Sequence, residues 1–274
     1  MKTIKGQRLF STLEDTQGER RDKQFLEEMV ARMPPRFPVG QHHDAAFPTV
    51  GYIEKFRLEE VTEHPGEWCI VGDVYVEDNF DWSKHGGFSY SATEIAKKKP
   101  DDVGVLYVPY PFYRDDKIID EILSYDPQLS AGRWVKKAAD PLTITLIVTL
   151  TLWTLTPLWK KVFDEQVWPF LERMLAKYRN GRFKDMPFDY GSMVVGRHKE
   201  VVNIQFIPDR RNCDNTFTKE LIKNGLEKAI KVIAEDKRGA TIPMKLVKLY
   251  YHDQCEGYRV SAIQYADGHE TNII

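Results

Sequence analysis

The stretch PLTITLIVTLTLWTLTPLW, residues 141–159, has nineteen residues without a charge, and its conformation decides the fold of the chain's centre. Lys136 and Lys137 precede it, and Lys160 and Lys161 follow it. A membrane-spanning helix needs about 20 apolar residues, and basic and aromatic residues at both ends suit the headgroup region. Six of the nineteen residues are threonine, which makes the hydrophobicity marginal. The alternatives are a buried helix, or strands in which threonine alternates with apolar residues.

The overall composition is that of an ordinary globular protein. Of the 274 residues, 42% are hydrophobic and 29% are charged, and the formal net charge is −2. Such a charge gives no basic field, so nucleic acid is not expected as a partner. The three cysteines are widely spaced and odd in number, which argues against a disulfide framework and fits a reducing compartment. Residues 1–30 lack an apolar core, so no secretory signal is expected and the predicted location is the cytoplasm.

The N-terminal half is predicted to combine helices with short strands. After a charged lead-in over residues 1–21, DKQFLEEMVARM has one apolar face at helical spacing, and two prolines follow it. Two alternating runs separated by HPG predict a β-hairpin. The expected elements are, in order, a helix at 22–33, strands at 51–61, 68–78, 86–95 and 103–112, and a helix at 115–123.

The C-terminal half is predicted to add a smaller unit. Its expected elements are a helix at 161–181 that Pro169 kinks or starts, a strand at 201–208, an amphipathic helix at 217–239, and a hairpin at 244–268. A β-α-β-β unit of this size can form its own core. The predicted fold class is therefore α+β: a β-rich, barrel-like N-terminal domain, an apolar helical segment and a small β-α-β-β domain. The expected boundaries are 1–21, 22–130, 131–181 and 182–274.

Two short motifs contain candidate catalytic residues. A serine hydroxyl needs a base to become a good nucleophile, and histidine is the usual base near neutral pH. In QHHDAAFP the candidate base is His43, with His42 as its rival. In GGFSYS the candidate nucleophile is Ser89, with Ser91 as its rival. The glycines of that second motif allow a backbone to approach closely, and adjacent N–H groups can stabilise an oxyanion. These glycines are Gly86 and Gly87.

The order of these motifs resembles that of the phage prohead (capsid-maturation) serine proteases and the related Mu-like protease/scaffold proteins. The matching stretches, all within residues 22–125, are HHDAAFPTVGYIEKFRLE, WCIVGDVYVED, GGFSYS and VGVLYVPYP. The resemblance implies a small barrel-like fold, cleavage of a polypeptide substrate by a Ser–His pair, homo-oligomers and no cofactor. By position, His43 matches the base and Ser89 the nucleophile. Asp120, Glu121 and Glu94 are candidates for the family's third polar partner on sequence position alone.

The predicted function is thus a serine endopeptidase of the prohead type with a fused C-terminal regulatory or sensing domain. The alternative is a non-catalytic protein that uses the same barrel to bind a partner, or that associates with a membrane through residues 141–159. HHD (residues 42–44) also resembles the histidine–aspartate pair of HD phosphohydrolases. Those proteins are helical, and no further cluster here has metal-ligand spacing, so no metal site is expected.

Overall fold

Two compact units, each with its own sheet, make up the part of the chain that the structure, a computed structural model, describes. It describes residues 1–274 except 16–17, 41–48, 79, 81–90, 137–142, 154–158, 209–212, 254–255 and 274. The first unit comprises residues 1–92, 136–140 and 267–270, and the second comprises 93–135, 141–266 and 271–274. The main division therefore falls after residue 92, ahead of the boundary expected at 130.

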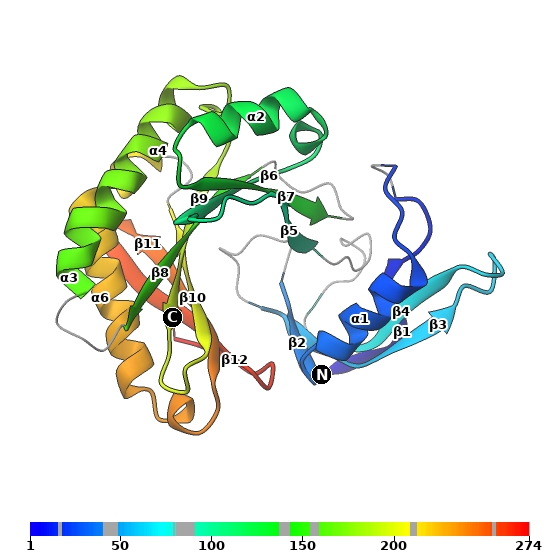
Figure 1. Ribbon diagram of the computed structural model, residues 1–274. Coiled ribbons are helices and arrows are strands. Elements are labelled where there is room, and N and C mark those ends of the chain that lie inside the picture. The colour runs from blue at the N-terminus through cyan, green and yellow to red at the C-terminus, as the bar shows by residue number, and fades with distance from the viewer. Residues whose placement is uncertain are drawn as a thin grey trace. The chain divides into compact units, whose positions relative to one another are not determined.

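The first unit is an antiparallel sheet with one helix packed on it (Figure 1). Its elements are β1 (Lys2–Ser11), α1 (Lys23–Arg32), β2 (Arg36–Val39), β3 (Gly51–Glu60) and β4 (Trp68–Val76), with the strand order β1-β4-β3-β2. The expected hairpin is confirmed, because β3 pairs antiparallel with β4. The expected helix is confirmed as well: Asp22 caps α1 by accepting a hydrogen bond from the N–H of Phe25 at 2.8 Å. Leu26 of α1 is fully buried against a core that includes Ile53 and Ile70.

Residues 2–11, expected to belong to a loose lead-in, form strand β1 instead. β1 lies at the edge of the sheet and pairs antiparallel with β4. Only Leu9 and Phe10 of this strand are buried. An edge strand with charged, exposed side chains has little hydrophobic periodicity, so the pattern of the sequence did not predict it.

Strands at 91–97 and 104–108 overlap the runs expected at 86–95 and 103–112, of which residues 86–90 are not described, but they belong to a different sheet from the hairpin. β5 (Ser91–Lys97) and β6 (Gly104–Val108) belong to a nine-stranded sheet with the order β13-β12-β11-β10-β9-β8-β6-β7-β5. Within the described residues, β1 to β4 form a sheet with β1 and β2 at its edges, and no closed barrel is found.

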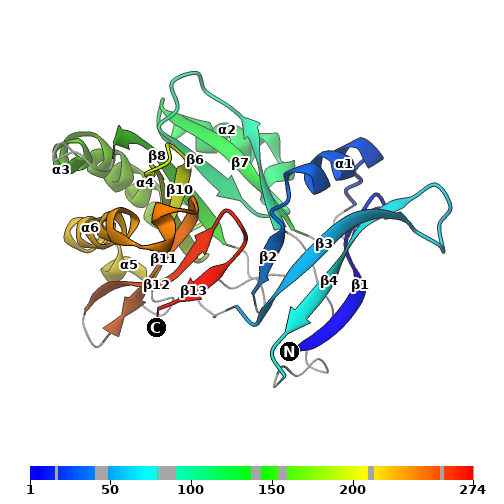
Figure 2. The ribbon, with the colours of Figure 1, turned by 90° about the horizontal axis from the view of Figure 1, so that it is seen from below.

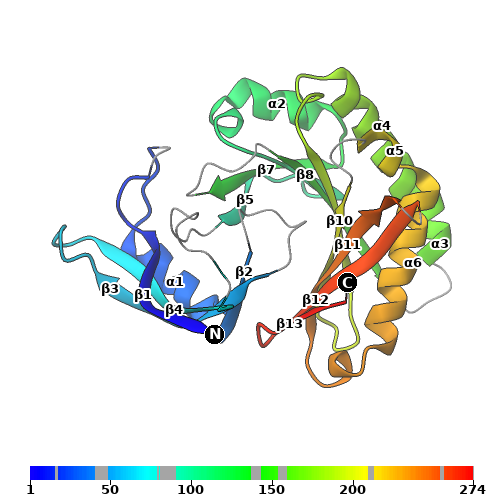
Figure 3. The ribbon, with the colours of Figure 1, turned by 180° about the vertical axis from the view of Figure 1, so that it is seen from behind.

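The second unit repeats one β-α-β arrangement three times in a single sheet. Its further elements are α2 (Asp116–Ser124), β7 (Leu129–Lys136), β8 (Ile144–Trp153), α3 (Trp159–Val162), a π-helical turn (Phe163–Val167), α4 (Trp168–Asn180), β9 (Phe188–Val195), β10 (Val201–Ile207), α5 (Cys213–Thr216), α6 (Lys219–Glu235), β11 (Met244–His252), β12 (Gly257–Tyr265) and β13 (Glu270–Asn272). The pairs β6/β7, β8/β9 and β10/β11 are parallel, and each is connected through a helix: α2, α4 or α6. These helices cover the same face of the sheet (Figure 3) and share one core that extends from Leu106 to Tyr265.

The expected β-α-β-β succession is present as β10, α6, β11 and β12, but it has no separate core. β10 pairs antiparallel with β9, so the sheet continues without interruption from the preceding strands. β11, β12 and β13 lie side by side at one edge of it (Figure 2). α6 lies close to the sheet because Gly225 has no side chain: a Cβ there would come within 2.5 Å of the Phe206 ring.

Residues 144–153 form strand β8, so the strand alternative for this run is confirmed and the helical segment placed here in the predicted fold class is wrong. β8 lies inside the nine-stranded sheet, antiparallel to β6 and parallel to β9. Its alternation directs Ile144, Leu146 and Val148 into the core, and each is at most 1% exposed. On the other face, Thr145 accepts a hydrogen bond from Nε1 of Trp134 at 3.1 Å. None of the helices in the described part of the chain is long and apolar enough to span a membrane.

We predict that Leu146→Ala lowers the free energy of unfolding by about 2–5 kcal/mol, because it leaves a cavity in the centre of the core. Val201→Ala is the matched control, since Val201 lies on a strand of the same sheet but is 54% exposed. Its expected cost is at most about 1 kcal/mol. Urea unfolding followed by circular dichroism measures both, and equal costs for the two variants would contradict the buried position of β8.

Candidate functional site

The central residues of the predicted catalytic motifs lie outside the described part of the chain. These are His42, His43, Asp44, Gly86, Gly87 and Ser89. Ser91, the rival nucleophile, is the first residue of β5. The Ser–His assignment and the two rival assignments therefore stay predictions.

Described residues on both sides of the first motif lie at one end of the four-stranded sheet, together with Glu77, which precedes the second motif. The N–H of Val50, six residues after HHD, donates to the carbonyl of Val39 at 2.9 Å, and the N–H of Glu77 donates to the carbonyl of Val50 at 3.1 Å. Gly51 is paired with both Val39 and Val76. A Cβ at Gly51 would lie 1.9 Å from a carbonyl oxygen of β4, so this close approach of strands requires glycine.

The three candidate third members are all held by cations of the second unit. Asp120 on α2 accepts a hydrogen bond from Lys97 at 2.8 Å. Glu121 on the same helix lies 2.8 Å from the guanidinium of Arg182 and accepts a hydrogen bond from the hydroxyl of Tyr125 at 2.8 Å. Glu94 on β5 accepts two hydrogen bonds, at 2.9 and 2.6 Å, from Arg133. Such pairs are typical of structural ion pairs between neighbouring elements.

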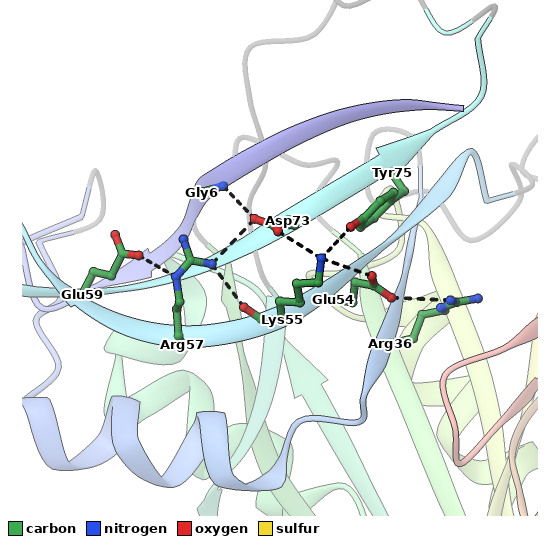
Figure 4. A network of polar contacts seen from close by, with 8 residues as sticks. All are labelled: Gly6, Arg36, Glu54, Lys55, Arg57, Glu59, Asp73 and Tyr75. Atoms are coloured by element: carbon green, nitrogen blue, oxygen red, sulfur yellow. Dashed lines mark hydrogen bonds and ion pairs between the residues drawn. The ribbon is translucent and has the colours of Figure 1, made fainter.

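The most connected polar cluster of the first unit surrounds Asp73, which the sequence analysis did not single out (Figure 4). Asp73 lies on the central strand β4 and is 7% exposed. Its Oδ1 accepts a hydrogen bond from the N–H of Gly6 at 3.1 Å and lies 3.6 Å from Nη1 of Arg57. Its Oδ2 lies 3.7 Å from Nζ of Lys55. One buried carboxylate thus contacts both neighbouring strands, β1 and β3.

A β-bulge on each neighbouring strand makes these contacts possible. The register of β1 shifts between Ile4 and Gln7, and that of β3 shifts between Glu54 and Arg57. Lys55 has a positive φ of 59°, a conformation that costs a residue other than glycine about 1–2 kcal/mol. The bulge leaves Glu54 and Lys55, adjacent in sequence, close to each other on the face of Asp73, with 4.0 Å between Oε1 and Nζ.

Two tyrosines extend the cluster across the sheet. Tyr52 and Tyr75 stack with their ring centroids 4.9 Å apart. The guanidinium of Arg36 lies 3.8 Å from the ring centre of Tyr52, within cation–π range. The hydroxyl of Tyr75 accepts a hydrogen bond from Nζ of Lys55 at 3.1 Å. Charged and aromatic groups from β2, β3 and β4 are therefore held together on one face.

The groups at the centre of this cluster are held in their charged forms. The N–H of Gly6, followed by Lys55 and Arg57, lowers the pKa of Asp73 below the ordinary aspartate value. The hydroxyl of Tyr75 and the nearby carboxylates raise the pKa of Lys55. A carboxylate and an ammonium fixed in this way provide charge but do not exchange protons near neutral pH. The cluster is therefore suited to holding the two bulges in place.

No group of three or more histidine, cysteine, aspartate or glutamate side chains could hold a metal ion within the described ranges. Comparison of the chain with family models, with curated proteins and with solved structures finds no match.

We predict that Asp73→Asn lowers the free energy of unfolding at neutral pH, because the amide loses the charge that Lys55 and Arg57 face. Because the pKa of Asp73 is lower in the folded state, its charge stabilises the fold at pH values above the unfolded-state aspartate pKa of about 3.9. This stabilisation is lost as the pH falls through the folded-state pKa. The free energies of unfolding of the wild type and the variant should therefore become equal in acid. Thermal unfolding across a pH series measures both free energies.

Glu59→Gln is the matched control, because Glu59 bonds Arg57 at 2.6 Å on the same face but is exposed and does not contact Asp73. It should change stability less than Asp73→Asn at neutral pH. The role given to Asp73 would be contradicted if wild type and Asp73→Asn were equally stable at neutral pH, or if the difference in their free energies of unfolding grew in acid.

Proposed function

We propose that the chain is a serine endopeptidase of the prohead-protease type that binds its polypeptide substrate as an added strand alongside β5. Ser89 is the nucleophile and His43 is the base in this proposal. The observation that carries it is the position of β5, the last strand in the order of the nine-stranded sheet. Ser89 precedes the first residue of that strand by two positions.

An edge strand offers unpaired backbone groups to an extended peptide, and main-chain hydrogen bonds then hold the peptide in register. Thr93, Ile95 and Lys97 of β5 are exposed, and Ile95 is 47% exposed although it is apolar. In the proposal, a peptide added along β5 would bind beside the strand whose first residue lies two positions after the candidate nucleophile Ser89.

The pairing at the end of the four-stranded sheet also supports the proposal. Because Val39, Gly51 and Val76 are in register, the segment that contains His43 and the chain that leads to Ser89 depart from the same end of that sheet.

In the proposed reaction, His43 takes the proton of the Ser89 hydroxyl as its oxygen attacks the peptide carbonyl. Backbone N–H groups near Gly86 and Gly87 stabilise the oxyanion, and His43 returns the proton to the leaving amine. Water activated by the same histidine then hydrolyses the acyl-enzyme. The C-terminal strands, expected to form a regulatory domain, belong to the same sheet as β5 but lie toward its opposite edge.

A non-catalytic protein that binds polypeptides at β5 is the second candidate. One observation favours it: the strands that the family keeps in one domain are divided here, with β3 and β4 in one sheet and β5 and β6 in another. Strand addition at β5 needs neither Ser89 nor His43. Both candidates therefore share the binding edge and differ in the chemistry.

We predict that a fluorophosphonate serine-hydrolase probe labels the wild-type protein covalently. Labelling should be lost in Ser89→Ala, which removes the nucleophile, and in His43→Ala, which removes its base. It should persist in Ser91→Ala, the matched control two residues away. In-gel fluorescence with intact-mass analysis measures the labelled fraction.

A folded wild type that resists the probe, or equal labelling of wild type and Ser89→Ala, would contradict the endopeptidase. Loss of labelling in Ser91→Ala alone would transfer the role of nucleophile to Ser91. Circular dichroism of each variant ensures that a loss of labelling is not a loss of fold.

A further inference from the structure

A cavity of about 310 Å³ opens between α4 and the start of α6 in the second unit. α4 contributes residues spaced by single helical turns, and α6 contributes its first residue together with the two residues that precede it. The lining residues are Trp168, Glu172, Leu175, Arg179, Phe217, Thr218 and Lys219. Its volume is at the lower end of the range found for small-molecule sites.

The start of α4 explains why a cavity forms at this place. The helix begins at Trp168 directly after the π-helical turn, and Pro169 lies in its first turn, as the sequence predicted. Proline has no N–H to donate to the carbonyl four residues earlier, so a regular α-helical turn is interrupted here. π-helical turns of this kind occur frequently at functional sites.

The floor of the cavity is apolar and firmly packed. Leu175 is 6% exposed and Phe217 is 5% exposed. The ring of Phe217 meets the ring of Phe188 edge to face at 5.5 Å, and Trp168 lies 6.4 Å from the ring of Phe163. Such contacts hold the aromatic rings in place without a ligand.

The rim of the cavity has an excess of positive charge. Lys219 and Lys223 share a single carboxylate, that of Asp164, at 3.0 and 2.7 Å, and the pKa of Asp164 is lowered by both lysines. Glu172 and Arg179 add one charge of each sign on α4. Asp164 and Lys223 do not line the cavity; among its lining residues, Lys219 and Arg179 are cationic and Glu172 is anionic, beside an apolar floor.

We propose that this cavity binds a small carboxylate with an apolar body. The carboxylate would pair with Lys219 and Arg179, and the apolar body would cover Trp168, Leu175 and Phe217. A neutral ligand of the same shape would forgo the charged hydrogen bonds, and a cationic one would be repelled. The cavity lies apart from β5 in the chain, and the inference does not depend on proteolysis.

The test compares three ligands of one shape, 3-phenylpropionate, 3-phenylpropionamide and 3-phenylpropylamine, with the full-length protein at constant ionic strength. Saturation-transfer NMR and tryptophan fluorescence give the affinities. We expect saturable binding of the carboxylate, about tenfold or more tighter than the amide, as one charged hydrogen bond would supply. The amine should not bind.

Lys219→Gln should weaken binding of the carboxylate about tenfold and leave the affinity for the amide unchanged. Asp164 keeps Lys223 in this variant, so the contact between the helices is retained. Lys231→Gln is the matched control, since Lys231 is exposed on the same helix and does not line the cavity. Ser89→Ala should bind the carboxylate like the wild type, which separates this test from that of the endopeptidase.

Equal affinity for carboxylate and amide, or equal weakening by Lys219→Gln and Lys231→Gln, would overturn the proposal. So would the absence of saturable binding to a wild type whose circular dichroism shows that it is folded.

Discussion

The pairing of β8 on both sides is the interaction on which the second unit depends. A segment of uncharged residues can satisfy its backbone as a helix, or as a strand with a neighbour at each edge. Here β6 and β9 supply those neighbours. Because β8 connects the strands before residue 137 to those after residue 187, a single core forms where a connector between two domains was expected.

The first unit depends on a different constraint, a carboxylate on its central strand. The charge of Asp73 faces β1 on one side and β3 on the other, and a bulge on each of those strands brings donors to it. Bulges bend a strand and raise its twist. The network therefore accounts for the irregular backbone of Lys55, which the local sequence alone would disfavour.

Local patterns predicted the elements with strong periodicity. The apolar face of α1, the β3–β4 hairpin and the amphipathic α6 were all evident because each has one buried and one exposed side. β1 was missed, since its side chains are mostly polar and its pairing is with a strand some 65 residues away. The uncharged run that contains β8 was assigned to a helical segment, with strands as the alternative, because periodicity alone does not distinguish a buried strand from a buried helix in such a run.

Local sequence patterns also do not reveal candidate sites whose residues come from distant segments of the chain. GDV in β4 gives no sign that the carboxylate of Asp73 is buried, because the partners Gly6 and Lys55 come from other strands. Likewise, the cavity beside Trp168 combines residues from two helices about 40 positions apart. The Ser–His pair was predicted from motif order alone, and it stays a prediction because His43 and Ser89 lie outside the described residues.

Hydrogen exchange measured by mass spectrometry would test most directly whether the chain from β6 to β12 forms one cooperative sheet. If it does, the amides of β8 exchange as slowly as those of β10 and β11, because all three open only on global unfolding of the unit. Amides of the edge strand β5 exchange faster. Rapid exchange throughout β8, with β10 and β11 still protected, would contradict the central position of β8 and restore a division of the chain at residues 141–159.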